Sequence, residues 1–153
     1  MENLKVIFYL DPKNKVLNYD LFSNHADQWA NRICSSGLKT KFDQKTKKEK
    51  EVLEKNKISQ IRKFYDEVLR FSEYLKAGED YKSILPYIKM LNAKAAYAEG
   101  RKLVTEDFKD FIKQTLAYLD DDPNSFKIFV SFFEAFMGYY KFYESQYKTE
   151  SED

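Results

Sequence analysis

The segment Leu91–Arg101 places basic and aromatic side chains at a spacing that suits nucleic-acid binding. It is rich in alanine, which favours a helix. Because residues three and four positions apart lie above one another on a helix, one row would hold Met90, Lys94, Tyr97 and Arg101. Two cations beside one aromatic ring suit phosphates and unstacked bases. The alternative is that Tyr97 belongs to the hydrophobic core and that the two cations are ordinary solvated residues.

The chain has few residues that could act as a nucleophile, a general base or a metal ligand. Its only histidine, His25, precedes its only cysteine, Cys34, by nine residues, which would put them on opposite sides of a helix. A Cys–His pair is therefore not expected, and Cys34 is predicted to be a buried, inert thiol. No Cys and His residues have the spacing of a metal site, and no glycine-rich loop could hold a phosphate.

The acidic run Asp120–Asp122 invites comparison with a calcium-binding loop. Such a loop, counted from Asp120, needs Gly at its sixth and Glu at its twelfth position, where this chain has Ser125 and Ser131. A turn in which Asp122 caps a helix beginning at Pro123 explains the run better. We therefore expect no catalytic residue, no metal and no cofactor. A small enzyme acting through the acidic run or His25 ranks third among the hypotheses.

Composition indicates a helical domain. The 153 residues suffice for one domain, and four glycines with three prolines are too few for the turns of an all-β fold. The chain is 33% charged and 17% aromatic, which fits helices with apolar inner faces and charged outer faces. We predict an all-α, single-domain bundle of about five helices with a short extended N-terminal segment.

The formal net charge of +1 conceals an uneven distribution. Residues 38–63 contain ten Lys or Arg against four Asp or Glu, whereas residues 64–153 contain twelve against seventeen. A basic segment attached to a mildly acidic body can engage polyanions. The alternative is that the lysines from Lys39 to Lys57 belong to a solvated loop or helix face.

The sequence predicts neither secretion nor a membrane span. Leu4–Leu10 is too short for a signal peptide and contains Lys5. Ser131 and Glu134 interrupt the most apolar stretch well before the ~20 residues that a span requires. A single cysteine excludes an internal disulfide, so we expect a soluble protein of the reducing cytoplasm.

We divide the chain into an N-terminal extended segment (residues 1–18), a helical bundle domain (19–148) and an acidic disordered tail (149–153). Val6–Tyr9 favours a strand, Asp11–Asn14 is a turn signal, and Val16–Leu17 could return as a second strand. The polar stretch Lys39–Glu54 is predicted to be a mobile linker or a solvent-facing extension of the next helix.

Apolar periodicity and capping residues predict five helices. The first covers Leu21–Ser35 with Phe22 on its apolar face and Gly37 beyond its end. The second follows Asn56 as a cap, buries a stripe that includes Leu69, and stops at Gly78. The third has Pro86 in its first turn and ends at Gly100, the fourth is capped by Thr105, and the fifth runs from Pro123 to about Tyr147.

The predicted fifth helix is apolar almost all round. Its polar residues fall in one narrow strip, made of Lys127, Ser131, Glu134, Gly138, Lys141, Ser145 and Lys148. A helix with so thin a polar side is either central in the bundle or covered by another subunit.

Three segments together carry a resemblance to a known family. They are Ile-Ser-Gln-Ile-Arg-Lys-Phe-Tyr-Asp-Glu-Val (58–68), the segment Leu91–Arg101, and Phe-Phe-Glu-Ala-Phe-Met-Gly-Tyr-Tyr-Lys-Phe-Tyr (132–143). In this order and spacing, the chain resembles the small subunit of type III-A CRISPR (Csm) effector complexes over roughly residues 20–147. Residues 1–18 and the lysine-rich stretch before Asn56 do not contribute to this resemblance.

The resemblance implies a non-catalytic helical subunit of a CRISPR ribonucleoprotein in the cytoplasm. Its partners would be the guide RNA and target RNA duplex, the repeated backbone subunit and the large subunit of the complex, and further copies of itself. It would stack along the inner face of the complex and touch RNA phosphates. The matching positions are first Arg62, Lys63 and Arg101, followed by Lys94, Lys57 and Lys141.

Each cation also has a structural alternative. Arg62 could pair with Asp66 and Lys63 with Glu67 across one helical turn, although such pairs contribute at most ~0.3 kcal/mol. Arg101 could bond the terminal carbonyls of its own helix. The competing functional hypothesis is a helical protein–protein adaptor that docks through its aromatic fifth helix and does not contact RNA.

Overall fold

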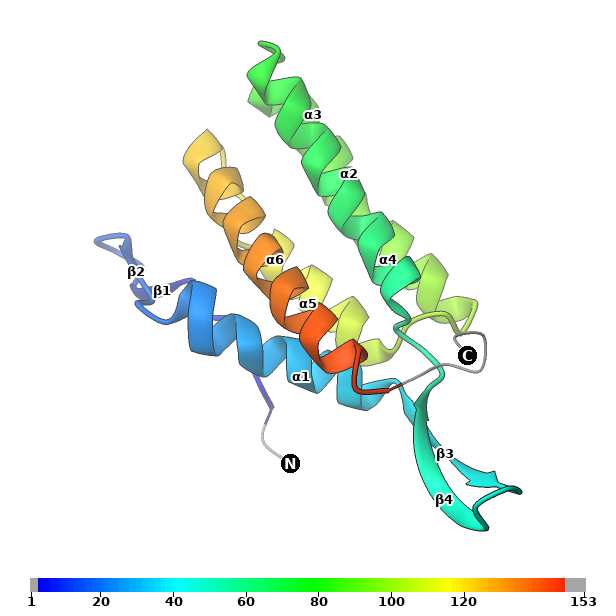
Figure 1. Ribbon diagram of the computed structural model, residues 1–153. Helices are drawn as coiled ribbons and strands as arrows, with labels where there is room; N and C mark the ends of the chain where they lie inside the picture. The colour runs from blue at the N-terminus through cyan, green and yellow to red at the C-terminus, as the bar shows by residue number, and fades with distance from the viewer. Residues whose placement is uncertain (1–2, 148–153) are drawn as a thin grey trace.

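The computed structural model describes residues 3–147, and most of them lie in helices (Figure 1). In chain order the elements are β1 (Tyr9–Asp11), β2 (Val16–Leu17), the π-helix η1 (Leu21–His25), α1 (Ala26–Ser36), β3 (Leu38–Asp43), β4 (Lys48–Leu53), α2 (Ile58–Lys76), α3 (Tyr81–Lys89), α4 (Leu91–Gly100), α5 (Glu106–Leu116) and α6 (Pro123–Glu144). The predicted helical bundle is confirmed, but the strands form two antiparallel pairs, so the fold is mostly helical and not strictly all-α. The tail predicted at residues 149–153 lies outside the described residues.

Helix α6 is the central element of the bundle. It packs against α1 and α2, and the Phe136 ring stacks on Phe111 of α5 with centroids 4.5 Å apart. The polar strip is exposed from Lys127 to Ser145. The phenylalanines that are buried beside it are Phe126, Phe129, Phe132, Phe133 and Phe136, whereas Phe142 near the end of the helix is 59% exposed. The thin polar side of this helix therefore reflects its central position within this chain.

The N-terminal segment packs on the end of the bundle, as a hairpin that starts slightly later than predicted. Phe8 is buried and stacks on Tyr118 at 4.3 Å between ring centroids. The Tyr118 hydroxyl donates to the Val6 carbonyl at 2.8 Å. The prediction that Phe22 is buried is wrong, because residues 21–25 form a π-helical turn that buries Leu21 and leaves Phe22 41% exposed.

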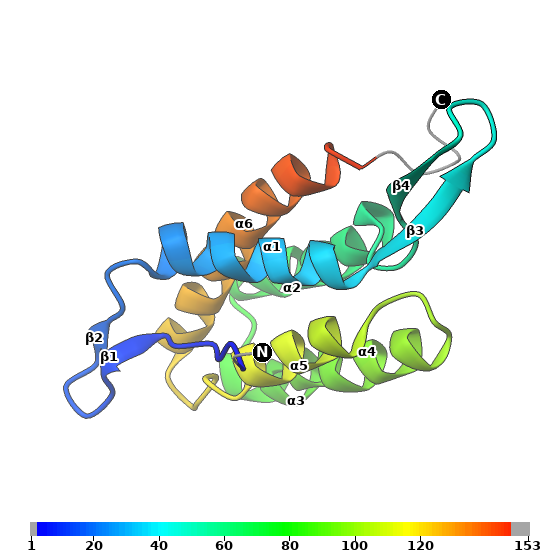
Figure 2. The same cartoon turned by 90° about the horizontal axis from the view of Figure 1, so that it is seen from below.

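The stretch predicted as a linker or helix extension is instead the hairpin β3–β4. Its register pairs Leu38 with Leu53 and runs without a bulge to the tip. At its base the Gly37 carbonyl accepts hydrogen bonds from the backbone N–H groups of Glu54 and Lys55, at 2.9 and 3.1 Å. A side chain at Gly37 would lie 2.2 Å from the Lys55 carbonyl oxygen, so this close approach requires glycine. Figure 2 shows the two hairpins at opposite ends of the molecule.

Asn56 does not cap α2 as predicted, because its side chain is buried and directed elsewhere. Its amide donates to the Ile33 carbonyl and to the Thr105 hydroxyl, at 2.9 and 2.8 Å, and accepts from the Thr105 N–H at 2.9 Å. Its backbone φ of +60° lies in the left-handed region that asparagine tolerates. The predicted caps at Thr105 and Asp122 are confirmed, since each side chain accepts a first-turn N–H.

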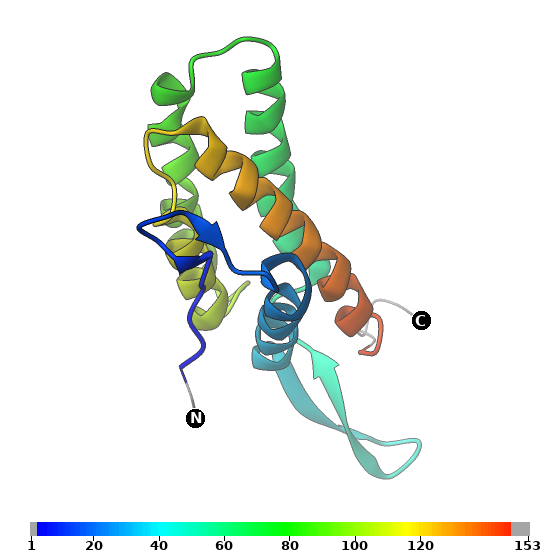
Figure 3. The ribbon, with the colours of Figure 1, turned by 90° about the vertical axis from the view of Figure 1, so that its left-hand side faces the viewer.

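The predicted third helix is two helices, α3 and α4, that meet at Met90 (Figure 3). Helix α3 begins earlier than the prediction, which placed Pro86 in the first turn, because Asp80 caps α3 by accepting the Ser83 N–H at 3.2 Å. The buried Tyr81 anchors this start, with its hydroxyl donating to the Asp120 carbonyl at 2.7 Å. Helix α2 ends before Gly78 as predicted, but Leu69 is 38% exposed and does not belong to the core.

Candidate nucleic-acid interface

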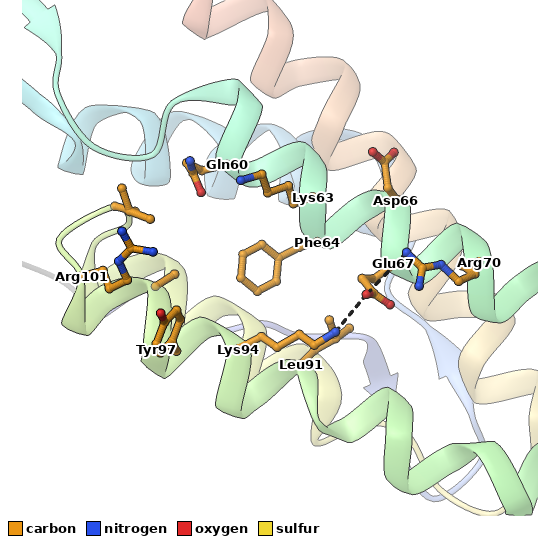
Figure 4. A pocket seen from close by; sticks show the side chains of 12 residues that line it. Gln60, Lys63, Phe64, Asp66, Glu67, Arg70, Leu91, Lys94, Tyr97 and Arg101 are labelled. Carbon is orange, nitrogen blue, oxygen red and sulfur yellow. Dashed lines mark hydrogen bonds and ion pairs between the residues drawn. The ribbon is translucent and has the colours of Figure 1, made fainter.

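A groove of about 450 Å³ lies between α2 and α4. Its inner wall is apolar, and charged side chains surround it (Figure 4). The apolar lining residues are Phe64, Leu91, Ala98 and Leu103, and the charged ones are Lys63, Asp66, Glu67, Arg70, Lys94 and Arg101. Four cations against two carboxylates leave the groove with a positive balance, which suits an anionic ligand.

Helix α4 presents the row that the sequence predicts. Arg101 is the first residue after α4, and its N–H still makes the helical hydrogen bond to the Tyr97 carbonyl, at 3.1 Å. The row therefore continues past the glycine. The Arg101 guanidinium carbon lies 5.8 Å from the centroid of the Tyr97 ring. Tyr97 is 67% exposed, so the alternative that it belongs to the core is wrong.

Glu67 organises the cations at the α3 end of the groove. Its carboxylate is 2.9 Å from the Lys94 ammonium and 3.6 Å from the Arg70 guanidinium. The alternative pairing of Lys63 with Glu67 is not formed, because this carboxylate is taken by cations from both helices. Within residues 3–147, neither Lys63 nor Arg101 has an ion-pair partner. These two cations are therefore available to an incoming anion.

The Arg101 guanidinium makes no hydrogen bond to the terminal carbonyls of α4 in the described part of the chain, so the structural alternative for its side chain is not what the structure shows. Its guanidinium lies over an exposed ring instead. An arginine over an aromatic face is held in orientation by a cation–π contact while its donors stay in solvent. This arrangement leaves the guanidinium fork free to bind a phosphate.

The structure brings three of the six predicted cations into the groove, namely Lys63, Lys94 and Arg101. Arg62 is exposed but lies about 100° around α2 from Lys63, outside the groove lining. Lys57 is exposed at the start of α2. The Lys141 ammonium lies on α6, 3.4 Å from a Glu144 carboxylate oxygen.

Sequence reasoning missed Arg70 as a groove residue. It lies seven residues after Lys63, which is two turns of α2, so both side chains reach the same side of the helix. The seven-residue spacing between Lys63 and Arg70 was the signal in the sequence that could have identified Arg70.

The remaining residues that could do chemistry are engaged in the fold. His25 is buried, and its Nε2 accepts the Ile7 N–H at 2.9 Å; burial lowers the pKa of this imidazole. Burial, followed by the nearby Glu144, raises the pKa of the Cys34 thiol to about 11. Residues 3–147 contain no cluster of His, Cys, Asp and Glu that could hold a metal ion. Across the same residues, none of the helices combines the length and apolarity needed to cross a bilayer.

Comparison with known families identifies the family of the chain that contains this groove. The family described as Csm2 Type III-A matches residues 17–146, which is most of the chain. The chain belongs to the Csm2 family. It is therefore a small, structural subunit of the type III-A CRISPR effector complex, where it assembles with other Csm subunits. Neither characterised proteins nor solved structures gave a match to the chain.

The Csm2 match confirms the resemblance found in the sequence and includes the whole α2–α4 groove. It also spans hairpin β3–β4, but it leaves out strand β1 and the residues before it.

Proposed function

We propose that this Csm2-family chain is a non-catalytic subunit that holds the backbone of the guide–target RNA in its α2–α4 groove. In the cytoplasmic complex it stacks along the inner face beside further copies of itself, the repeated backbone subunit and the large subunit. The observation that carries this proposal is that Lys63 and Arg101, which have no ion-pair partner within residues 3–147, line one groove together with the exposed ring of Tyr97.

The groove suits recognition of backbone rather than sequence. In RNA-guided complexes base pairing reads the sequence, so a small subunit needs only to recognise shape and charge. Lys63, Lys94 and Arg101 come from two different helices and face one trough, where a strand of phosphates can lie. Tyr97 adds a ring on which an unpaired base can stack without preference for its identity.

A single copy is expected to bind weakly. Neutralising three phosphates of a single strand gives a log–log salt slope of about −2. Several copies held in register along one RNA gain affinity through effective concentration. Arg62, Lys57 and Lys141 lie outside the groove lining, so the proposal assigns them to RNA that runs past the groove.

Reversing the charges of Lys63 and Arg101 should weaken the binding of target RNA. Effector complexes assembled with Lys63→Glu/Arg101→Glu subunits should bind target RNA at least tenfold more weakly at physiological salt. The salt slope should become shallower by about 1.4 for each copy engaged, because two single-strand phosphate contacts are lost. The measurement is target affinity across a salt series, with complex composition checked by native mass spectrometry.

A matched control replaces two lysines outside the groove by glutamate. Lys76 and Lys82 are exposed and do not line the groove, so Lys76→Glu/Lys82→Glu should leave affinity unchanged. If correctly assembled complexes carrying the groove variant keep full target affinity, the RNA proposal is refuted and the adaptor hypothesis takes its place.

The structure weakens the physical basis of the adaptor hypothesis as stated. Its docking surface was the aromatic fifth helix, but Phe129, Phe133 and Phe136 of α6 are fully buried within this chain. An adaptor would have to dock through the exposed end of α6 at Phe142 or through another face.

A further inference from the structure

Hairpin β3–β4 is the strongest feature that the groove does not use. It projects away from the helices in all three overall views (Figures 1–3). Every residue from 44 to 51 is exposed, whereas Leu53 at the base is buried. A two-stranded hairpin is marginal by itself in water, so the anchored base must hold the arm in place. The exposed outer half of this arm, residues 44–51, is placed to contact a partner.

The register sorts the charges of this arm onto two faces. Residues directly opposite in an antiparallel pair share a face, and successive residues alternate between faces. Lys39, Lys41 and Asp43 on β3 are opposite Val52, Lys50 and Lys48 on β4, so one face carries four lysines and one aspartate. The other face carries Glu49 and Glu51 with Thr40 and Phe42. We call the first of these the lysine face.

The lysine face carries closely spaced cations together with one aspartate. Lys41 is directly opposite Lys50, so this face places two cations side by side. The carboxylate of Asp43, on the same face, accepts the Lys45 N–H at 2.9 Å and so closes the turn. Lys39 is paired with Glu54 at 3.3 Å, but both side chains are about half exposed, and an exposed pair exchanges readily.

The arm extends the track of cations that begins in the groove. Lys63 and Arg101 line the groove, and Lys57 marks the start of α2, which follows directly from β4. Each strand of the arm is six residues long, or about 20 Å, and lysines two positions apart recur every ~7 Å along it. A strand of RNA that leaves this end of the groove would therefore meet further regularly spaced cations.

We propose that the lysine face of hairpin β3–β4 is a second RNA-backbone site, which grips RNA beyond the groove. Charge complementarity favours a polyanion over a protein partner, because the cations are displayed on one exposed ribbon face with no apolar side chain among them near the tip. This inference rests on the proposed function, since it takes the RNA to run past the same subunit.

A charge swap tests the proposal without altering net charge. The variant Lys48→Glu/Glu49→Lys/Lys50→Glu/Glu51→Lys moves two lysines from the lysine face to the opposite face. On this face it turns the Lys41–Lys50 pair into an opposite-charge pair and the Asp43–Lys48 pair into a like-charge pair, so the number of cross-strand pairs of each kind stays the same. In assembled complexes we expect RNA affinity to fall about tenfold at physiological salt, with a slope shallower by about 1.4 per engaged copy. Unchanged affinity would overturn the proposal.

Photo-crosslinking identifies what the face touches. A photo-crosslinking amino acid replaces Lys48 in one complex and Glu49 in the control complex. Each complex is prepared twice, once with labelled guide RNA and once with labelled target RNA. Crosslinks to either RNA from position 48, and few from position 49, are expected. Crosslinks from position 48 mainly to a protein subunit would overturn the RNA assignment.

The outcomes separate this inference from the proposed function. Loss of affinity in Lys63→Glu/Arg101→Glu complexes but not in the charge-swap complexes would refute the hairpin site alone. Loss in the charge-swap complexes but not in the groove variant would refute the groove and leave the hairpin as the RNA site.

Discussion

Asn56 joins three helices of the bundle, two through its side-chain amide and one through its backbone carbonyl. It bonds the end of α1 through Ile33 and the start of α5 through Thr105. Its own carbonyl accepts the Tyr140 hydroxyl of α6, and its N–H donates to the Leu103 carbonyl at 3.0 Å. One buried residue thus fixes where α2 begins, and with it the position of the α2 side of the groove.

Replacing Asn56 should lower the free energy of unfolding more than an ordinary polar substitution does. Asn56→Ala leaves the Thr105 N–H and the Ile33 carbonyl without these partners and forces alanine into a left-handed backbone conformation. We expect a loss of about 3 kcal/mol in the free energy of unfolding, measured by urea denaturation at unchanged m-value. Asn92→Ala, at an exposed position of α4, is the control and should change stability by less than about 0.5 kcal/mol. Equal effects of the two substitutions would contradict this role.

At the scale of elements, His25 couples the N-terminal segment to η1. Its Nε2 accepts the Ile7 N–H, which requires the neutral imidazole, and burial lowers its pKa from 6.5. Below pH 6.5 the unfolded chain takes up a proton that the folded chain resists. The free energy of unfolding should therefore fall as pH decreases from 6.5 toward the folded pKa, by up to about 1.4 kcal/mol per pH unit.

The His25 prediction is checked by urea denaturation between pH 5 and 7. His25→Gln retains an acceptor for the Ile7 N–H but does not titrate, so its unfolding free energy should change less across this interval than that of the parent chain. Parallel pH profiles for the two proteins would show that His25 does not carry the effect.

Helices with strong apolar periodicity could be predicted from the sequence, and hairpin β3–β4 could not. Phe126, Phe129 and Phe133 recur at helical spacing, and this spacing specifies a buried stripe whatever the helix packs against. The hairpin consists largely of lysine and glutamate, which favour helices over strands, and it has no Asn-Gly or Asp-Gly turn. Its strands exist because the base is held at Gly37 and Leu53, and that is a tertiary effect.

The groove was predictable on its α4 side and less so on its α2 side. Lys94, Tyr97 and Arg101 follow from one helix and its spacing. On α2, Arg62 and Lys63 are adjacent in sequence, and only the packing of α2 against α4 selects Lys63 for the groove. The ion pair between Glu67 and Lys94 joins residues 27 positions apart, a distance that helix periodicity cannot reveal.

For the whole molecule, charge is separated along the chain rather than balanced locally. The net charge of +1 limits indiscriminate attraction to polyanions, while residues 38–63 concentrate positive charge on the hairpin and the first turns of α2. The groove and the lysine face lie on different elements and share no residue. Their contributions to RNA binding should therefore be nearly additive.

The isolated subunit offers a direct measure of that additivity. Three groove contacts and two at the hairpin predict a log–log salt slope of about −3.5 for single-stranded RNA, observed by fluorescence anisotropy at low salt. The groove reversal and the charge swap should each reduce the slope by about 1.4, and their combination should bring it close to −0.7. Light scattering in parallel verifies that all variants have the same association state. A slope near zero for the parent subunit would mean that it does not engage phosphates, since counterion release accompanies every such contact whatever the affinity.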